Sequence, residues 1–105
     1  MLTLILTKKW YDMIASGEKT EEYREIKEYY TKRFQNAGLI DELGCSTYKT
    51  ADIVFRCGYA KKAPKMLCTC RCWRGKGKEA WGALLSASYY VLTIYNKVVM
   101  PCEST

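Results

Sequence analysis

Apolar and polar residues alternate over residues 1–6, with leucine at every second position, which is typical of a strand with one buried face. Apolar residues then recur at helical spacing over 8–16, and Gly17 is well placed to end this helix in a left-handed conformation. The apolar stripe of this helix consists of Trp10, Met13 and Ile14. A second helical pattern covers 28–37 and stops at Gly38. Both helices of the fold are therefore expected in the first third of the chain.

Four further segments carry the alternating pattern of strands. They cover residues 20–27, 51–57, 66–73 and 89–95. The stretches 39–50 and 75–82 are rich in turn-forming residues and are predicted to be loops. Strands outnumber helices and mostly follow them, which favours the α+β class. For a chain of 105 residues we expect a single domain over 1–105, with a curled or barrel-like sheet and two helices packed at its rim.

The formal net charge of +6 is concentrated in residues 61–78, which contain seven basic residues and no acidic one. These are Lys61, Lys62, Lys65, Arg71, Arg74, Lys76 and Lys78. Such a cluster provides an electrostatic footprint for phosphates, although a solvated lysine-rich face has the same composition. The apolar stretch at the N-terminus is too short for a signal peptide or a membrane span. We therefore expect a cytoplasmic protein that does not contact membranes.

The six cysteines are expected to be reduced thiols, because disulfides are rare in cytosolic proteins. Cys68, Cys70 and Cys72 alternate and so fall on one face of a predicted strand. Structural zinc sites usually draw on cysteine pairs with longer spacing and on histidine, and the chain has no histidine. We interpret the three thiols as core side chains and expect neither a metal nor a cofactor. The lack of histidine also excludes Ser–His and Cys–His catalytic pairs and histidine-ligated zinc hydrolases.

The most informative segment is 17–24, GEKTEEYR, in which a helix end is followed by a lysine and then by a strand. Glu22 and Arg24 fall on one face of that strand, and Thr20 can share this face by alternation. On a solvent face, such a Glu–Arg pair contributes little to stability, and this is the ordinary interpretation. If the face points inward, the charges must be paired or line a wet cleft, because burying them unpaired is costly.

The same segment resembles the G-x-K-x-x-E-x-R signature of ASCH domains, which are relatives of the PUA RNA-binding fold. The matching positions are Gly17, Lys19, Glu22 and Arg24. Further blocks are similar to those of small stand-alone ASCH proteins from bacteria and phages. These blocks cover 10–14, 29–34, 56–59 and 79–83. The resemblance implies a PUA-like curled β-barrel with two helices that flank a cleft, into which Lys19, Glu22 and Arg24 project.

The resemblance implies that the protein binds RNA or a nucleotide-like ligand. The residues expected to bind it are Lys19, Glu22, Arg24, Arg56, Tyr59 and Trp10. Single-stranded nucleic acid is commonly held by such a mixture of cationic and aromatic side chains.

Two alternatives stay open. Some ASCH proteins are hydrolases, including amidohydrolases that act on N-acetylated cytidine and a ribonuclease, and the amidohydrolase signature has threonine where this chain has Glu22. A hydrolase here would use Lys19 as base, with Glu22 beside it and Thr20 or a water as nucleophile. The third hypothesis is a protein-interaction module that uses the basic segment 61–78.

Overall fold

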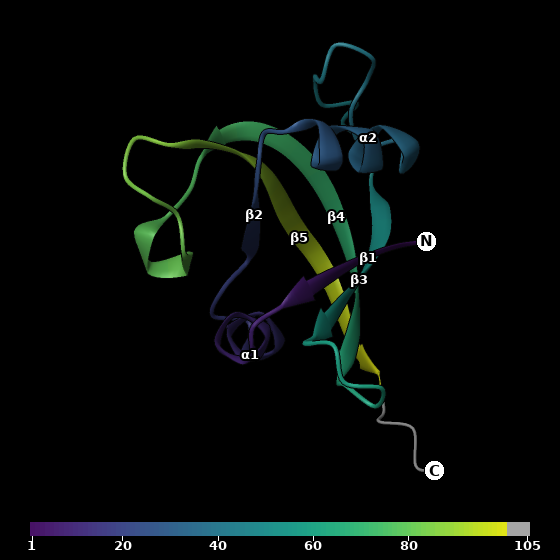
Figure 1. The fold of residues 1–105 in the computed structure, drawn as a ribbon, viewed down its shortest axis with the longest axis vertical. Helices are drawn as coiled ribbons and strands as arrows, with labels where there is room; N and C mark the ends of the chain where they lie inside the picture. Colours follow the sequence, from purple (N-terminus) through teal and green to yellow (C-terminus); the bar gives the residue numbers. More distant parts are fainter. Residues whose placement is uncertain (101–105) are drawn as a thin grey trace.

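The structure, a computed structural model, describes residues 1–100 as an α+β fold built on one five-stranded sheet (Figure 1). The elements in chain order are β1 (Leu2–Leu6), α1 (Lys8–Ser16), β2 (Glu21–Glu25), α2 (Glu28–Asn36), β3 (Ala51–Cys57), β4 (Lys65–Lys76), a 3-10 turn (Glu79–Trp81) and β5 (Ser88–Met100). The predicted α+β class with two helices is confirmed, and β4 and β5 extend beyond their predicted ranges. Within residues 1–100, no helix is long and apolar enough to cross a membrane.

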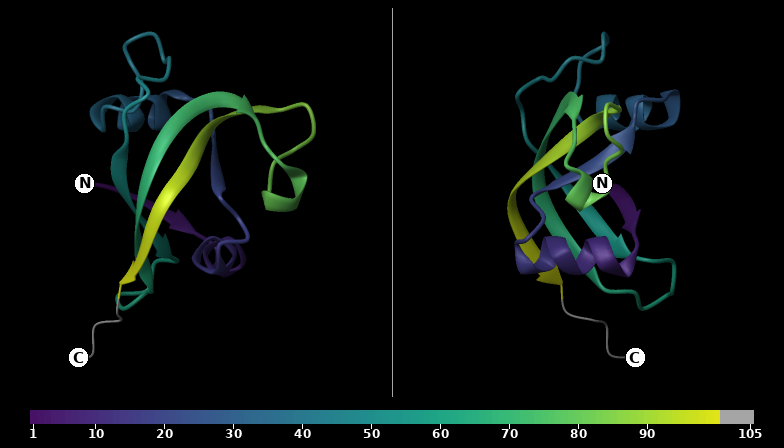
Figure 2. Two further views of the ribbon diagram at one scale, coloured as in Figure 1. Left: turned by 180° about the vertical axis from the view of Figure 1, so that it is seen from behind. Right: turned by 90° about the vertical axis from the view of Figure 1, so that its left-hand side faces the viewer.

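The sheet has the strand order β1-β3-β4-β5-β2, and only the β1–β3 pair is parallel. β4 and β5 are long and bent, so the sheet curls into a half-barrel (Figures 1 and 2). A bulge accompanies this bend, because the partners of Thr69 and Cys70 in β5 are Asn96 and Ile94, and Tyr95 is skipped. α1 and α2 lie at opposite ends of β2 (Figure 1), which places one helix at each end of that strand.

The core occupies the concave face of the half-barrel, where alternate residues of β3, β4 and β5 meet. Cys68, Cys70 and Cys72 are fully buried there, which confirms that the three thiols share an inward face. Burial raises the pKa of the Cys68 and Cys72 thiols to about 12. The helices add Tyr11, Ile14 and Phe34 to this core. The cysteine run therefore serves as close packing beneath the helices.

The buried stripe of α1 differs from the predicted one. Tyr11 accompanies Ile14 in the core, whereas Trp10 and Met13 are only half-buried. Neighbouring positions on a helix point about 100° apart, so the exchange of Trp10 for Tyr11 on the buried face corresponds to a rotation of α1 by up to this angle. The rotation leaves Trp10 on the flank of the helix, where it lines a pocket.

Candidate functional site

The candidate site lies at the seam of the half-barrel, between β1 and β2, the two outermost strands of the sheet. Arg24 of β2 crosses this seam, and its Nη2 donates a hydrogen bond to the backbone carbonyl of Ile5 in β1 over 2.9 Å. A pocket of about 300 Å³ lies beside this contact. Its lining combines the end of β1, residues 22–25 of β2, and side chains from both helices and β5. A long polar side chain therefore links the two edges of the sheet at this point.

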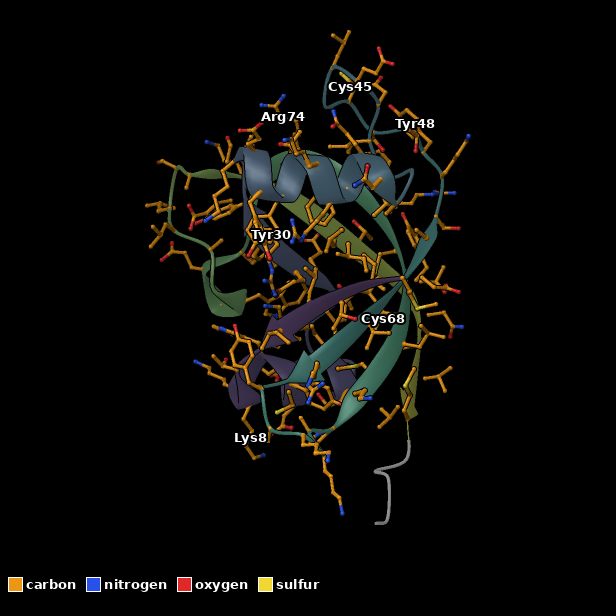
Figure 3. The ribbon with its side chains drawn as sticks, turned by 45° about the vertical axis from the view of Figure 1, so that its right-hand side comes forward. Lys8, Tyr30, Cys45, Tyr48, Cys68 and Arg74 are labelled. Carbon is orange, nitrogen blue, oxygen red and sulfur yellow. The ribbon has the colours of Figure 1, made fainter. Side chains whose placement is uncertain are left out.

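Four aromatic residues line the pocket, each from a different element: Trp10 of α1, Tyr23 of β2, Tyr30 of α2 and Tyr89 of β5. The Tyr23 and Tyr89 rings lie with their centroids 5.7 Å apart. Tyr30 is stacked on Phe34 of the core, with centroids 6.0 Å apart. In Figure 3, Tyr30 lies between α2 and the strands of the sheet. Aromatic faces from several directions suit a flat ligand, because rings stack on one another at such distances.

Glu22 is a buried carboxylate that lines this pocket, with 6% of its surface exposed. Its Oε1 lies 2.9 Å from Nζ of Lys19. Its Oε2 accepts hydrogen bonds from Nε and Nη2 of Arg24, over 3.1 and 2.8 Å. The Glu–Arg face thus points inward with its charges paired, and the interpretation as a solvent-exposed ladder is wrong. Two cations around one carboxylate give the cluster a formal charge of +1.

Arg24 keeps part of its hydrogen-bonding capacity for a ligand. Of the five N–H groups of a guanidinium, two donate to Glu22 and one donates to the carbonyl of Ile5. A fourth, on Nη1, donates to the hydroxyl of Tyr30 over 3.2 Å. One N–H on Nη1 is left, and the Tyr30 hydroxyl keeps its own proton to donate. The pocket therefore combines unused donors with a carboxylate that can accept further hydrogen bonds.

Lys19 supports the site from behind and does not line the aromatic pocket. It is 2% exposed, and its Nζ donates to the carbonyl of Trp81 over 2.7 Å in addition to its contact with Glu22. The same Nζ lies 4.3 Å from the centre of the Trp10 ring. Lys19 and Thr20 line a separate hollow of about 250 Å³ beside β5. The exposed Thr20 precedes β2, and its backbone carbonyl accepts a hydrogen bond from the Ile94 amide over 3.0 Å.

The loop between β4 and β5 packs against the outside of the site. The Tyr23 hydroxyl accepts a hydrogen bond from the amide of Lys78 over 2.9 Å and donates one to Glu21 over 2.8 Å. Gly77 is required here, because a Cβ at this position would lie 2.7 Å from the Tyr23 ring. Gly82, with φ of +102°, passes against Trp10 in the same way. The block 79–83, noted from the sequence, thus contacts Trp10 through Gly82, whereas the contacts with Tyr23 come from Gly77 and Lys78 directly before it.

Of the remaining residues expected to bind ligand, Trp10 lines the pocket and Arg56 and Tyr59 do not. Arg56 donates hydrogen bonds to the carbonyls of Gly58 and Ala60, so it holds the turn between β3 and β4. Tyr59 is 86% exposed in that turn. The sequence does not predict a ligand-binding role for the other three aromatic residues of the lining, Tyr23, Tyr30 and Tyr89.

The basic segment 61–78 forms a stripe. Lys61 and Lys62 lie in the turn before β4, and Lys78 lies beyond its other end. The 12 residues of β4 span roughly 36 Å at the usual rise per residue. Arg74 lies near α2 at one end of the molecule (Figure 3). The seven charges are therefore distributed along the whole sheet and do not converge on the pocket.

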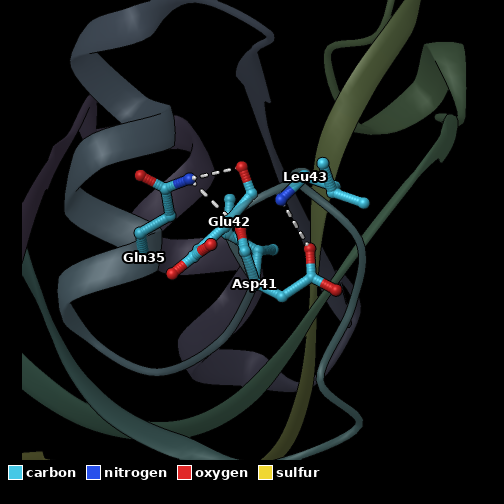
Figure 4. A pocket seen from close by; sticks show the side chains of 5 residues that line it. Gln35, Asp41, Glu42 and Leu43 are labelled. Carbon is cyan, nitrogen blue, oxygen red and sulfur yellow. Dashed lines mark hydrogen bonds between the residues drawn. The ribbon is translucent and has the colours of Figure 1, made fainter.

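A larger hollow of about 820 Å³ lies where the loop after α2 folds back on the helix (Figure 4). Part of its polar surface is used in hydrogen bonds within the loop and to α2. Gln35 Nε2 donates to the carbonyls of Asp41 and Glu42, and Asp41 Oδ1 accepts from the amides of Leu43 and Cys45. Among the described residues, the lining of this hollow has no aromatic residue and no cation, and its acidic residues are exposed, so the seam pocket is the better candidate site.

No protein-family model, curated protein or solved structure matches the chain. The class of the protein is therefore defined by its own fold and site. It is an α+β protein with a curled five-stranded sheet, and an aromatic pocket lies at the seam of that sheet around the buried Glu22 and its partner Arg24.

Proposed function

We propose that this chain is an ASCH-type, PUA-like module that binds RNA or a nucleotide-like ligand in the seam pocket. One observation carries the proposal. Four aromatic residues line the same pocket as the buried Glu22 and its hydrogen-bonded partner Arg24. Nucleobases are flat and carry hydrogen-bond donors and acceptors side by side on one edge. The pocket offers stacking surfaces for such a ring together with a carboxylate and a guanidinium for its edge.

The ASCH assignment rests on the signature residues and on the form of the fold. Glu22 and Arg24 line the pocket, and Lys19 holds Glu22 from behind. A curled sheet with one helix at each end of β2 agrees with the PUA-like barrel that the signature implies.

Binding is favoured over hydrolysis by the arrangement of Lys19 and Thr20. The ammonium of Lys19 is held by Glu22 and by the carbonyl of Trp81, and Lys19 is not among the residues that line the aromatic pocket. Thr20 lines a different hollow. A base and a nucleophile would need to meet at one place in the pocket, so we expect a binding module without turnover.

The proposal is tested by titrating the protein with the four common nucleosides and a panel of modified ones, while tryptophan fluorescence is followed. Trp10 lines the pocket and reports occupancy. Tyr30→Leu should weaken binding by about 5- to 150-fold, the range that corresponds to about 1–3 kcal/mol for one stacked ring. The matched control is Tyr29→Leu, on the same helix but outside the lining. Equal effects of the two variants, with circular dichroism unchanged, would refute binding in this pocket.

A further inference from the structure

Two lysines lie at opposite ends of the seam pocket. Nζ of Lys9, in the first turn of α1, is 4.6 Å from the centre of the Trp10 ring. Nζ of Lys27, directly before α2, is 5.5 Å from the centre of the Tyr30 ring. Both rings line the pocket, one from each helix. Each lysine therefore places a cation beside one aromatic wall.

Neither lysine takes part in an ion pair within residues 1–100, where the pairs use Lys8, Lys19, Arg24 and Lys32. Both side chains are exposed and free to reorient. The two ends are not equal, because the exposed Glu25 also lines the pocket close to Lys27 in sequence. Glu28 follows Lys27 as well, although it contacts Lys32 over 3.3 Å. The Lys9 end is thus the more positive of the two.

The distance between these ends is set by β2. Trp10 contacts Lys19, just before this strand, and Tyr30 accepts from Arg24 near its other end. Lys19 and Arg24 both contact the single carboxylate of Glu22, which joins the two ends across the pocket. Each lysine reaches inward on a flexible four-carbon stem. A single nucleoside has no phosphate and so offers nothing to a cation at either end. A nucleotide inside a strand carries one phosphate on each side of its base.

We infer that the pocket takes an internal nucleotide of single-stranded RNA, with its two flanking phosphates on Lys9 and Lys27, in preference to a free nucleoside. This inference rests on the proposed function and states the ligand class for the same pocket. The Glu22–Arg24 pair recognises the edge of the base, and the lysines contribute affinity without regard to base identity. Phosphate contacts of this kind weaken with added salt, because each contact releases counterions from the strand.

The experiment compares the four homotrinucleotides, each with two phosphodiesters, with the four matching nucleosides by calorimetry at 50 and 200 mM salt. The best trinucleotide should bind about 10-fold more tightly than its nucleoside at the lower salt. Lys9→Ala and Lys27→Ala should each weaken trinucleotide binding by about 2- to 5-fold, Lys9→Ala more strongly. Each should also reduce the slope of log K against log salt by about 0.7. Neither variant should alter nucleoside binding.

The charge-matched control is Lys49→Ala, in the exposed loop before β3 and outside the lining. A trinucleotide with uncharged methylphosphonate linkages should bind like the nucleoside. Equal affinity for nucleoside and trinucleotide, or equal effects of Lys9→Ala, Lys27→Ala and Lys49→Ala, would overturn the inference while the proposed function stands. Absence of binding by every nucleoside and trinucleotide would refute the proposed function itself.

Discussion

Replacing Lys19 with methionine removes a buried ammonium from the site and keeps a side chain of similar length. The side chain of Lys19 is 1% exposed and that of Glu22 is 7% exposed. In the variant, Glu22 stays buried with Arg24 as its remaining charged partner, and the carbonyl of Trp81 loses its donor. Breaking a buried pair costs about 3–5 kcal/mol. Because Arg24 still compensates Glu22, we expect the lower end, about 3 kcal/mol.

A loss of this size is a large part of the stability of a small domain, which is typically about 5–15 kcal/mol. Urea denaturation followed by circular dichroism measures it. Lys8→Met is the matched control, since Lys8 forms its ion pair with Asp12 on the surface, with side chains 82% and 55% exposed. This control should leave the denaturation midpoint nearly unchanged, because exposed pairs contribute little.

Amide hydrogen exchange gives a second readout for Lys19→Met. Residues 78–83 should exchange faster, because the bond from Lys19 to the Trp81 carbonyl holds this loop on the site. Amides of the β4 segment over the core should keep their protection in conditions that favour the native state. A loss of stability below about 1 kcal/mol, the scale of an exposed pair, would refute the reasoning that this buried pair supports the site.

Two further predictions concern packing and thiol chemistry. Gly77→Ala should destabilise the protein by about 1–3 kcal/mol, because its Cβ would lie 2.7 Å from the Tyr23 ring, whereas Gly75→Ala, with no neighbour within 4 Å, should be tolerated. Urea denaturation compares the two variants, and equal stability would contradict the close packing of the loop. Iodoacetamide at pH 8 should alkylate the exposed Cys45 and spare the buried thiols, whose raised pKa leaves little thiolate. The spared residues are Cys68, Cys70 and Cys72. Peptide mass spectrometry reads the labelling, and equal rates at all four sites would contradict their burial.

Alternation along the strands was sufficient to find much of the fold and the centre of the site. It placed Glu22 and Arg24 on one face, and in the sheet they pair with Leu92 and Tyr90, whose side chains are buried. It could not decide whether that face points to solvent or to the interior, because this depends on the strand that β2 pairs with. That strand, β5, lies more than 60 residues away in the chain.

The aromatic lining was harder to predict from the sequence. Tyr23 falls on the opposite face of β2 from Glu22. It nevertheless lines the pocket, because β2 is an edge strand and the pocket lies along its free edge. The role of Lys19 depends on a contact with Trp81, 62 positions further along. Local spacing carries no information about such contacts, whereas it does predict buried positions within one element.

The strand order also determines when the pocket is completed during synthesis of the chain. Residues 21–25 of β2 pair with 89–93 of β5, the last strand in the described part of the chain. Although several residues of the pocket lie within the first 30 positions, those of β2 have no strand to pair with until β5 has left the ribosome. A nascent chain that ends before β5 should therefore bind no ligand in this pocket, so that recognition begins only after β5 has been synthesised.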